Sequence, residues 1–174
     1  MKAVSIFIFR SIVILALQLF VLNDIVLKSS LSFLGFPAFI PMLYPLLLLL
    51  LPVNTPAYLA MLLGMGTGLL VDYFINTPGM HAAACVLLCY MRPSLLRLFF
   101  QQSAKELGGV EPTLYRMGFR SFFLYILLAV SIHHLFFYML QIWSMKNAGY
   151  IFFKSTLSIL LTLLLIILSQ VLFA

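Results

Sequence analysis

The sequence predicts an all-α membrane protein with six transmembrane helices, and three observations support this fold class. The chain of 174 residues is 64% hydrophobic and only 8% charged, which is far outside the composition of water-soluble domains. Its mean hydropathy is +1.18. Apolar windows of about 20 residues, long enough to cross about 30 Å of hydrocarbon, recur along the chain. We therefore expect one transmembrane domain over residues 1–174 and no soluble domain.

Six apolar windows are expected to span the membrane. They cover residues 4–27, 36–51, 57–75, 79–100, 118–142 and 150–173. The first window shares a positive start, Lys2, and an apolar run with secretory signal peptides. However, Arg10 interrupts that run and no small-x-small cleavage site follows it. We interpret this window as the first span.

The basic residues are distributed unevenly between the two sets of connections. With the N-terminus in the cytoplasm, the inner segments hold Lys2, Arg10, Arg92, Arg97, Lys105, Arg116 and Arg120, and the outer segments hold Lys28, Lys146 and Lys154. Cytoplasmic segments carry the excess of Lys and Arg in membrane proteins. We therefore predict that both termini are cytoplasmic. In this interpretation the net charge of +6 reflects the excess of basic residues on the cytoplasmic side. We therefore expect no nucleic-acid partner.

Residues 92–117 are predicted to form a basic cytoplasmic loop that follows the fourth span. Pro93 should kink or end that helix, with the following residues continuing at the inner interface. Long basic side chains there can reach lipid phosphates. The residues predicted to contact anionic lipid or a cytoplasmic partner are Arg92, Arg97, Arg116 and Arg120.

The second window contains a regular series of prolines. Pro37, Pro41 and Pro45 recur every four residues, and each removes a backbone donor and kinks a helix. We expect a bent helix that its neighbours must shield from lipid. Two interpretations are open: the bend is a wedge that shapes the bundle, or it opens towards a partner or a ligand cavity.

The chain lacks the residue patterns of intramembrane enzymes. There is no G-x-S-x-G serine and no H-E-x-x-H motif. Its four acidic residues are too far apart in sequence to share a helical face and hold a metal ion. Cys85 and Cys89 lie four residues apart within one span, which is too few ligands for a metal site. We expect no enzymatic activity, no catalytic residue, no metal and no cofactor.

One stripe of small residues ends in an embedded acid. Ala60, Gly64, Gly68 and Asp72 are each four residues apart, so they lie along a single helical face. Small residues at this spacing let helix backbones approach closely in lipid. A charge facing lipid at the centre of a helix would cost about 2.5–3.5 kcal/mol. We therefore predict that the stripe is a packing face and that Asp72 faces protein and has a hydrogen-bond donor.

Candidate donors for Asp72 follow from depth in the membrane. The short turn after the third span returns His81 beside the end of that helix. On the fifth span, His133 and His134 reach the same outer half, although adjacent histidines point about 100° apart, so only one can face Asp72 squarely. We expect an outer polar cluster, with His81, His133 and His134 serving helix packing or partner docking.

Two alternatives to this cluster remain. Asp24 lies at a similar depth on the first span, but it could equally form an ordinary interfacial pair with Lys28. His81 could simply lie at the level of the lipid headgroups.

The order of these features resembles the MreD family, the rod shape-determining membrane proteins of bacteria, in a version similar to those of the Bacteroidetes. The resemblance covers essentially the whole chain. It rests on the third-span segment "GMGTGLLVDYFINTPGMHA", then "YMRPSLLRLF", a basic loop, and "HHLFF" in the fifth span.

The resemblance implies a non-catalytic scaffold of the bacterial cell-elongation machinery, the elongasome, in the inner membrane. Members of the family work with the single-span protein MreC. Through it they act with the MreB filament, a SEDS glycosyltransferase and a class B penicillin-binding protein during peptidoglycan synthesis. We hypothesise that the stripe and Asp72 fix the bundle so that one lateral face docks the span of an MreC-like partner.

The family is also thought to share the fold of the substrate-binding subunits, or S-components, of energy-coupling-factor transporters. This likeness gives an alternative function, a substrate-binding membrane subunit of a vitamin or small-molecule transporter. Such subunits typically present an Ala-x-x-x-Ala face on the first helix. The corresponding region here reads "RSIVILALQLFVL" and lacks that pair, which disfavours the alternative.

Overall fold

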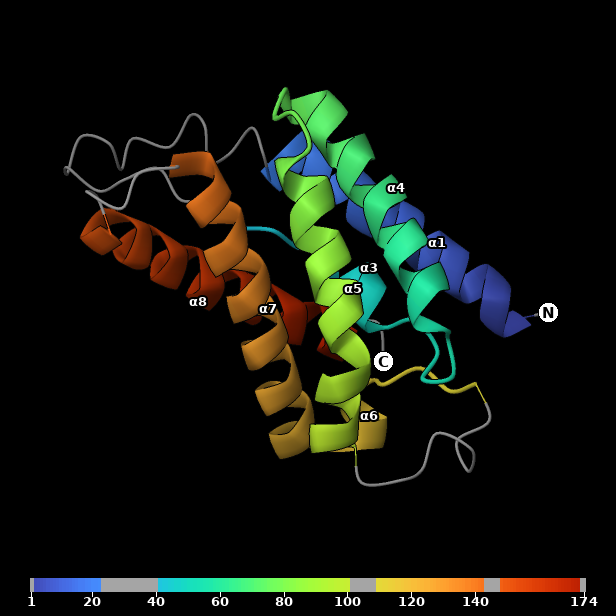
Figure 1. The fold of residues 1–174 in the computed structure, drawn as a ribbon. Helices are drawn as coiled ribbons and strands as arrows, with labels where there is room; N and C mark the ends of the chain where they lie inside the picture. The colour runs from blue at the N-terminus through green and yellow to red at the C-terminus, as the bar shows by residue number, and fades with distance from the viewer. Residues whose placement is uncertain (1, 23–40, 101–108, 143–147, 173–174) are drawn as a thin grey trace.

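The fold was analysed in a computed structural model that describes residues 2–22, 41–100, 109–142 and 148–172. Every element assigned within these residues is a helix (Figure 1). Four helices are long and apolar enough to cross a membrane. They are α4 (Ala57–Ile75), α5 (Met80–Phe99), α7 (Phe119–Ile142) and α8 (Ala148–Leu172). The predicted all-α fold is confirmed for the described residues, and the length and composition of these four helices suggest a membrane protein.

These four helices agree with four of the predicted windows to within two residues at either end. Helix α4 matches the predicted range 57–75 at both ends. It ends where Asn76 adopts the left-handed conformation, with φ of 60°, and Asn tolerates this conformation at a helix C-terminus. Gly79, with φ of 77°, then starts α5 in the opposite direction. The "NTPG" turn therefore sets α4 and α5 side by side.

The first window is helical throughout its described part. Helix α1 (Lys2–Leu17) continues as a π-helical turn, η1 (Gln18–Leu22), and residues 23–27 lie outside the described residues. Its apolar stretch Phe9–Leu22 is shorter than the four spanning helices. Asp24 and Lys28, the alternative interfacial pair, also lie outside the described residues.

The prediction of a proline-kinked spanning helix over 36–51 is wrong for the residues that are described. Residues 36–40 lie outside them, and of the remainder only α3 (Pro45–Leu49) is helical. We call residues 41–51 the buried segment, because every one of them is buried. Hydropathy measures the preference for leaving water, so it does not distinguish a lipid-facing helix from a leucine-rich segment enclosed by protein.

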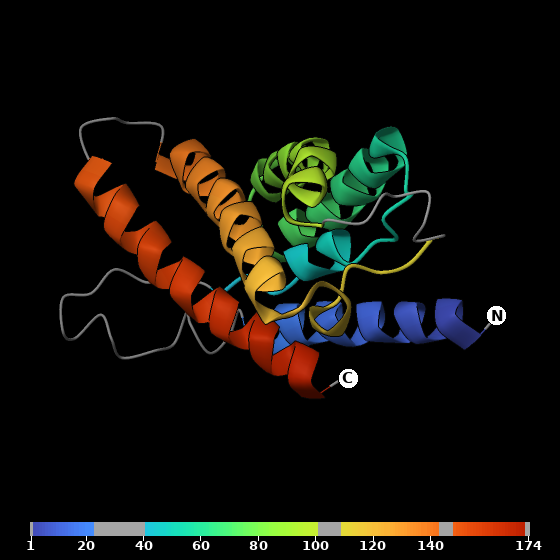
Figure 2. The same ribbon diagram turned by 90° about the horizontal axis from the view of Figure 1, so that it is seen from below.

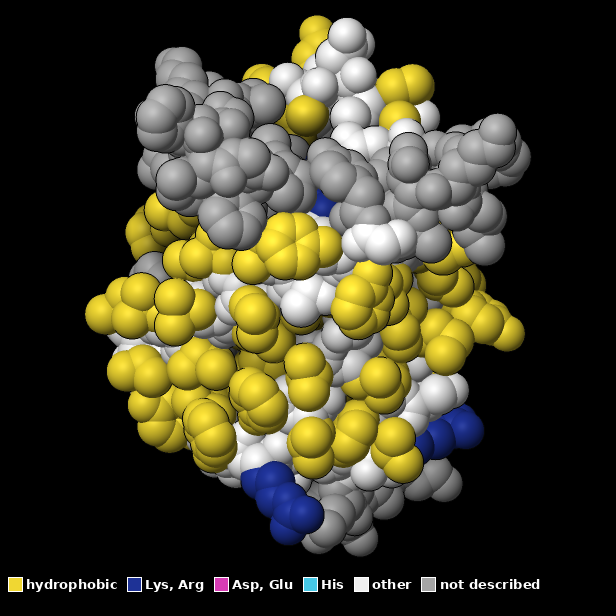
Figure 3. Space-filling view, turned by 90° about the vertical axis from the view of Figure 1, so that its left-hand side faces the viewer, with side chains coloured by type: hydrophobic (Ala, Val, Ile, Leu, Met, Phe, Trp, Pro, Cys, Tyr) yellow, Lys and Arg dark blue, Asp and Glu magenta, His cyan; other side chains and the backbone are white. Residues whose placement is uncertain are grey.

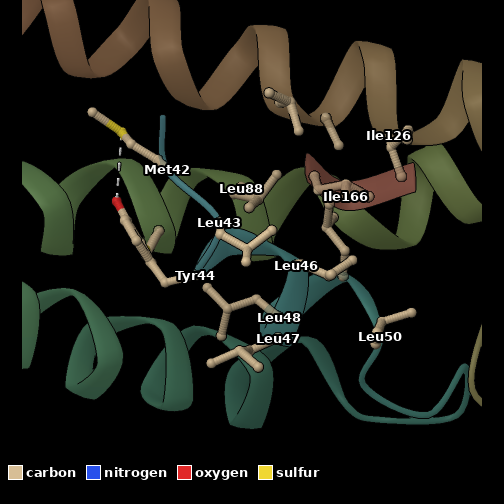
Figure 4. Close-up of a cluster of buried hydrophobic side chains, with 14 of the residues drawn as sticks. Met42, Leu43, Tyr44, Leu46, Leu47, Leu48, Leu50, Leu88, Ile126 and Ile166 are labelled. Atoms are coloured by element: carbon tan, nitrogen blue, oxygen red, sulfur yellow. Dashed lines mark hydrogen bonds between the residues drawn. The ribbon is translucent and has the colours of Figure 1, made fainter. Parts of the chain in front are cut away.

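The buried segment lies at the centre of the bundle. Seen from below, α3 lies between the α4–α5 pair on one side and α1 on the other, with α7 and α8 beside it (Figure 2). In Figure 4 the leucines of the segment pack against Leu88 of α5, Ile126 of α7 and Ile166 of α8. The helices therefore surround a core that is itself a piece of irregular chain, which the membrane tolerates only where protein encloses it.

The predicted loop range 92–117 overlaps the predicted fourth window, 79–100, and the structure follows the window up to Phe99. Helix α5 continues through Pro93 to Phe99, so the first part of the range 92–117 belongs to a spanning helix. Residues 101–108 lie outside the described residues. A one-turn helix, α6 (Leu114–Met117), then leads into α7.

The surface of the bundle is dominated by apolar side chains. In Figure 3 they cover most of the described face. Dark-blue Lys and Arg side chains lie towards the lower end, and a small dark-blue patch is also visible near the top. Many large apolar residues are exposed on α4, α5, α7 and α8. This distribution is that of a protein whose sides contact lipid and whose ends contact water.

Candidate functional site

Asp72 caps the start of the next helix. Its Oδ1 accepts hydrogen bonds from the Thr77 hydroxyl at 2.8 Å and from the backbone nitrogen of His81 at 3.0 Å. Its Oδ2 accepts one from the backbone nitrogen of Ala82 at 3.0 Å. The side chain is buried, with 5% exposed. A carboxylate at a helix N-terminus satisfies donors that the helix itself leaves unpaired and matches the positive end of its dipole.

The prediction that Asp72 faces protein and has a donor is therefore confirmed, but the expected donor is wrong. We expected a histidine side chain, and the carboxylate instead accepts from backbone N–H groups of α5 and from a hydroxyl of the turn. The short turn brings the first turn of α5 directly against the carboxylate. A single side chain thus ties the end of α4 to the beginning of α5.

The small-residue stripe is a packing face between α4 and α5, as predicted. Ala60, Gly64 and Gly68 are all buried. A Cβ placed on Gly68 would lie 2.3 Å from the Cα of Ala82, and one placed on Gly64 would lie 2.9 Å from the Sγ of Cys89. Backbone meets backbone here with no room for a methyl group. Gly64, Gly68 and Asp72 therefore form the contact between α4 and α5. Any surface that binds a partner must consist of other residues.

The buried segment receives polar side chains from several helices. Near its start, the Gln18 amide donates to the Pro41 carbonyl at 3.2 Å and accepts from the Leu43 nitrogen at 2.6 Å. The nitrogen of Met42 donates to the Thr162 hydroxyl at 3.0 Å. Backbone groups that no helix pairs would otherwise be costly in a membrane interior.

The end of the buried segment is held in the same way by α5 and α7. The Arg92 guanidinium donates to the carbonyls of Leu51 and Pro52, and the Tyr125 hydroxyl donates to the carbonyl of Leu49 at 3.1 Å. His81 and Arg92 are separated along α5 by about 16 Å at 1.5 Å per residue. The α5 contacts that hold the segment are therefore spread along that helix over a length about half the thickness of a hydrocarbon layer, which is about 30 Å.

The prediction that Arg92 reaches lipid phosphate is wrong. Its side chain is 1% exposed, and its Nη2 donates to the carbonyls at the end of the buried segment. A basic residue near the inner end of an apolar run has the sequence signature of an interfacial arginine, and only the position of α3 reveals the carbonyls that it meets. Arg97, Arg116 and Arg120 are exposed. Arg97 lies in the last turn of α5, Arg116 in α6 and Arg120 in the first turn of α7.

Two of the three histidines of the predicted polar cluster, His81 and His133, meet at Tyr44. The Tyr44 hydroxyl lies 2.7 Å from the Nδ1 of His81 and 3.0 Å from the Nε2 of His133. All three side chains are buried. Both imidazoles meet the Tyr44 ring edge-on, with centroids 5.6 and 5.5 Å away. The hydroxyl therefore joins α5 to α7 through the first residues of the buried segment.

His134 belongs to a different part of this cluster, in agreement with the expected divergence of adjacent histidines. Its Nδ1 lies 3.0 Å from the carbonyl of Val130, and its Nε2 lies 3.2 Å from the Thr162 hydroxyl. A carbonyl accepts only, so Nδ1 carries the hydrogen and Nε2 accepts from Thr162. His134 thus joins α7 to α8.

An apolar groove runs along the outer side of the α4–α5 pair. Its volume is about 560 Å³, and it is lined by Met61, Met65, Leu69, Ala82, Ala83, Val86, Leu87 and Tyr90. Methionine side chains are flexible and adapt to differently shaped apolar partners. Among its lining residues, Met65, Leu69 and Tyr90 are exposed large apolar side chains.

Sequence reasoning missed four residues that organise the interior: Gln18, Tyr44, Tyr125 and Thr162. Each is a single polar residue in a strongly apolar run. That is the same signal that singled out Asp72, and it applies to uncharged side chains too, because buried polar groups are rarely left without partners.

Within the described ranges, no group of three or more His, Cys, Asp or Glu side chains is arranged to hold a metal ion. Cys85 and Cys89 are buried thiols. No protein-family model, no curated protein and no solved structure matches this chain.

Proposed function

We propose that the chain is a non-catalytic membrane scaffold of the bacterial cell-elongation machinery, as its resemblance to the MreD family implies. The observation that carries this proposal is the apolar groove on the α4–α5 face. In it we place the single transmembrane helix of an MreC-like partner. Through that partner the scaffold would position the peptidoglycan synthases, with both termini in the cytoplasm and the bundle in the inner membrane.

The hydrogen bonds of the buried polar side chains support a structural role for the protein. Asp72 caps α5, Arg92 and Tyr125 hold the end of the buried segment, and Gln18 holds its start. These groups stabilise a particular arrangement of helices. A scaffold needs such a fixed arrangement, because its lateral surface must keep one shape for its partner.

The character of the groove supports a transmembrane helix as its occupant. Helix association in lipid depends on close van der Waals packing, since lipid tails are as apolar as leucine. Ala82 and Ala83 line the groove with small side chains, which lets a partner helix approach closely. Met61 and Met65 are flexible and can adjust to the shape of that helix. On α4, a Cβ added to Gly66 would meet no atom within 4 Å, which leaves room for close approach beside the groove.

Site-specific photo-crosslinking tests this proposal. A photoreactive amino acid is placed at Leu87 in the groove, and for comparison at Leu164, an exposed position on α8. The scaffold proposal expects a crosslink to a single-span partner from position 87 that is absent or much weaker from position 164. Equal crosslinking at both positions, or none to any single-span protein, contradicts it.

A second candidate is the substrate-binding subunit of a small-molecule transporter. The observation in its favour is the convergence of Tyr44, His81 and His133 towards one point inside the bundle. Polar groups that converge in an apolar surrounding are typical of small-molecule sites. Mass spectrometry of the protein purified in mild detergent separates the two candidates, because a transporter subunit would retain a metabolite and copurify with an ATPase pair.

A further inference from the structure

The histidine–tyrosine cluster contains a buried nitrogen that the fold does not use. Nδ1 of His133 has no hydrogen-bond partner among the described residues, and its side chain is fully buried. The opposite nitrogen of the same ring faces the Tyr44 hydroxyl at 3.0 Å. Unpaired polar atoms in protein interiors are uncommon and costly. In membrane proteins, buried ionisable groups often belong to proton pathways.

The hydrogen bonds restrict where protons can be. The Tyr44 hydroxyl has one hydrogen, and the Sδ of Met42 lies 4.0 Å from it as a third, weaker partner. When that hydrogen goes to one imidazole, the hydroxyl accepts an N–H from the other. If it donates to Nδ1 of His81, then His133 carries its hydrogen on Nε2 and its Nδ1 is a free base. If it donates to Nε2 of His133, then His81 carries a hydrogen on Nδ1 and the Nδ1 of His133 is an unpaired N–H. The first arrangement becomes the second when a proton is gained at the Nδ1 of His133, hydrogens shift along the three groups, and a proton is lost from the Nε2 of His81.

We propose that His133, Tyr44 and His81 form a buried proton-binding site in which Tyr44 passes the proton between the two imidazoles. A proton enters at the Nδ1 of His133. The Nε2 hydrogen of His133 moves to the Tyr44 oxygen, and the Tyr44 hydrogen moves to the Nδ1 of His81. His133 and Tyr44 are then neutral again, and His81 carries the charge. One proton is bound and no other group is consumed.

The distances allow this transfer. The tyrosine oxygen lies 2.7 Å from one imidazole nitrogen and 3.0 Å from the other, which is within the range of ordinary hydrogen bonds. His134 does not take part, because both of its nitrogens are already engaged. Its Nδ1 donates to Val130, and its Nε2 accepts from Thr162.

The groups around the site come from every helix packed against it. Helix α5 contributes Cys85, whose Sγ lies 3.9 Å from the Nε2 of His133, and α7 contributes His134 and Tyr138, with the His134 ring centroid 5.5 Å from that of His133. The Tyr138 hydroxyl is bonded to Ser158 of α8 at 2.7 Å. These groups are neutral when unmodified, so they do not fix a charge on His133.

Among the described residues, Asp72 and Lys154 are charged groups at the edge of the cluster. The Asp72 carboxylate of α4 bonds the backbone nitrogens of His81 and Ala82. The Lys154 ammonium of α8 lies 5.1 Å from the centroid of the Tyr138 ring and within 3.4 Å of the Gln141 side chain. The acid is next to His81 and the lysine is beyond Tyr138, so the local field favours a positive charge on His81 over one on His133.

An aromatic neighbour adds to this preference. The ring of Phe137 lies 4.3 Å from that of His81, centroid to centroid, with the planes tilted by 34°. A cation at this distance from an aromatic face is attracted by the ring. In this proposal the unpaired Nδ1 of His133 accepts the proton. The positive charge is more stable on His81, beside Asp72 and Phe137.

Nitrogen-15 NMR of the histidines tests the proposal directly, because the chain contains only three of them. Protein labelled with 15N-histidine is placed in detergent micelles and titrated over the pH range in which it stays folded. His134→Gln assigns the third imidazole by its missing signals. The measured variant is Tyr44→Phe, and its matched control is Tyr125→Phe, which removes a buried hydroxyl bonded to Leu49, away from the histidines.

The expected result is that the signals of His81 and His133 change together over one pH interval in the unmodified protein. In Tyr44→Phe they should separate, and in Tyr125→Phe they should remain together. If Tyr44→Phe does not fold, His133→Gln replaces it, and the response of His81 should then move to a different pH. Imidazoles that stay neutral until the protein unfolds, or that titrate in the same way with and without Tyr44, overturn the proposal.

Discussion

The carboxylate of Asp72 and the backbone nitrogen of His81 are 3.0 Å apart, and this hydrogen bond joins the end of α4 to the first turn of α5. The same carboxylate bonds Ala82 and Thr77. The isolated acid of this apolar sequence thus accepts hydrogen bonds from the turn that follows α4 and from the first turn of α5. Its position explains why a charged residue is compatible with this depth in the membrane.

Replacing Asp72 with alanine should weaken the fold strongly. Each buried N–H left unpaired costs about 1–3 kcal/mol, and two are released, so we expect a loss on the order of 3 kcal/mol. For a chain of this size that lowers Tm by about 6–12 °C. Asp72→Asn keeps one acceptor oxygen and should lose less. Thermal unfolding in detergent measures both, and equal stability of Asp72→Ala and the unmodified protein would contradict the capping role.

Two glycines of α4 form a matched pair for testing the helix contact. A methyl group at Gly68 would overlap the backbone of Ala82, whereas one at Gly66 meets no atom within 4 Å. Gly68→Ala should cost about 1–3 kcal/mol or more through overpacking. Gly66→Ala should gain about 0.5–1 kcal/mol from helix propensity. Similar melting temperatures for the two variants would show that α4 and α5 are not in close contact.

Arg92 and Arg97 lie in the same helix but should differ in their effect on stability. Arg92→Met leaves the carbonyls of Leu51 and Pro52 without their donor, and hydrogen bonds to charged groups contribute about 1.5–3 kcal/mol. Arg97→Met alters an exposed side chain and should change stability by less than about 0.5 kcal/mol. Comparing their thermal unfolding tests the buried role. A larger loss from Arg97→Met would refute it.

Glu111 lies outside the spanning helices, and it should make the free energy of unfolding depend on pH. Burial raises the pKa of its carboxyl, and the nearby Arg10 at 3.7 Å and Arg116 offset this only in part. Because the folded-state pKa lies above the unfolded one, this contribution is present at low pH and is lost as pH rises through the folded pKa. Glu111→Gln should therefore be equal to or more stable than the unmodified protein at neutral pH. Melting curves at several pH values, with the advantage vanishing in acid, check this sign.

The exposed arginines Arg97, Arg116 and Arg120 should bind anionic headgroups. Basic residues near a membrane surface contribute about 1 kcal/mol each towards anionic lipid. Adding phosphatidylglycerol to detergent-purified protein should raise Tm, and the triple Arg→Gln variant should lose most of that rise. The triple Arg→Lys variant, which keeps the charge, should retain it. An unchanged lipid effect in the Gln variant would leave these residues with a role in topology only.

Much of this fold follows from hydropathy and residue spacing. The packing use of Ala60, Gly64 and Gly68 was predictable because helical periodicity fixes which residues share a face. The gathering of His81 and His133 was predictable because the short turn and the rise per residue place them at a similar depth. Long apolar windows bounded by turn residues also fixed α5, α7 and α8 within two residues.

The interior could not be predicted for a physical reason. The leucine run of the buried segment looks like a span, because composition does not report whether lipid or protein surrounds a segment. Arg92 and Tyr125 find their acceptors only once the segment is in place. Tyr44 meets two histidines that are 37 and 89 residues away in sequence, and no local pattern predicts such contacts.

The proposed role of the bundle is to hold other membrane proteins in place. Affinity purification of the chain from its native membrane in mild detergent, with companion proteins identified by mass spectrometry, tests this role most directly. We predict enrichment of an MreC-like single-span protein together with wall-synthesis enzymes, and a lower yield when the groove is filled by Ala83→Trp but not when Leu164→Trp alters α8. Recovery of an ATPase pair with a bound small molecule, and no wall-synthesis protein, would contradict it.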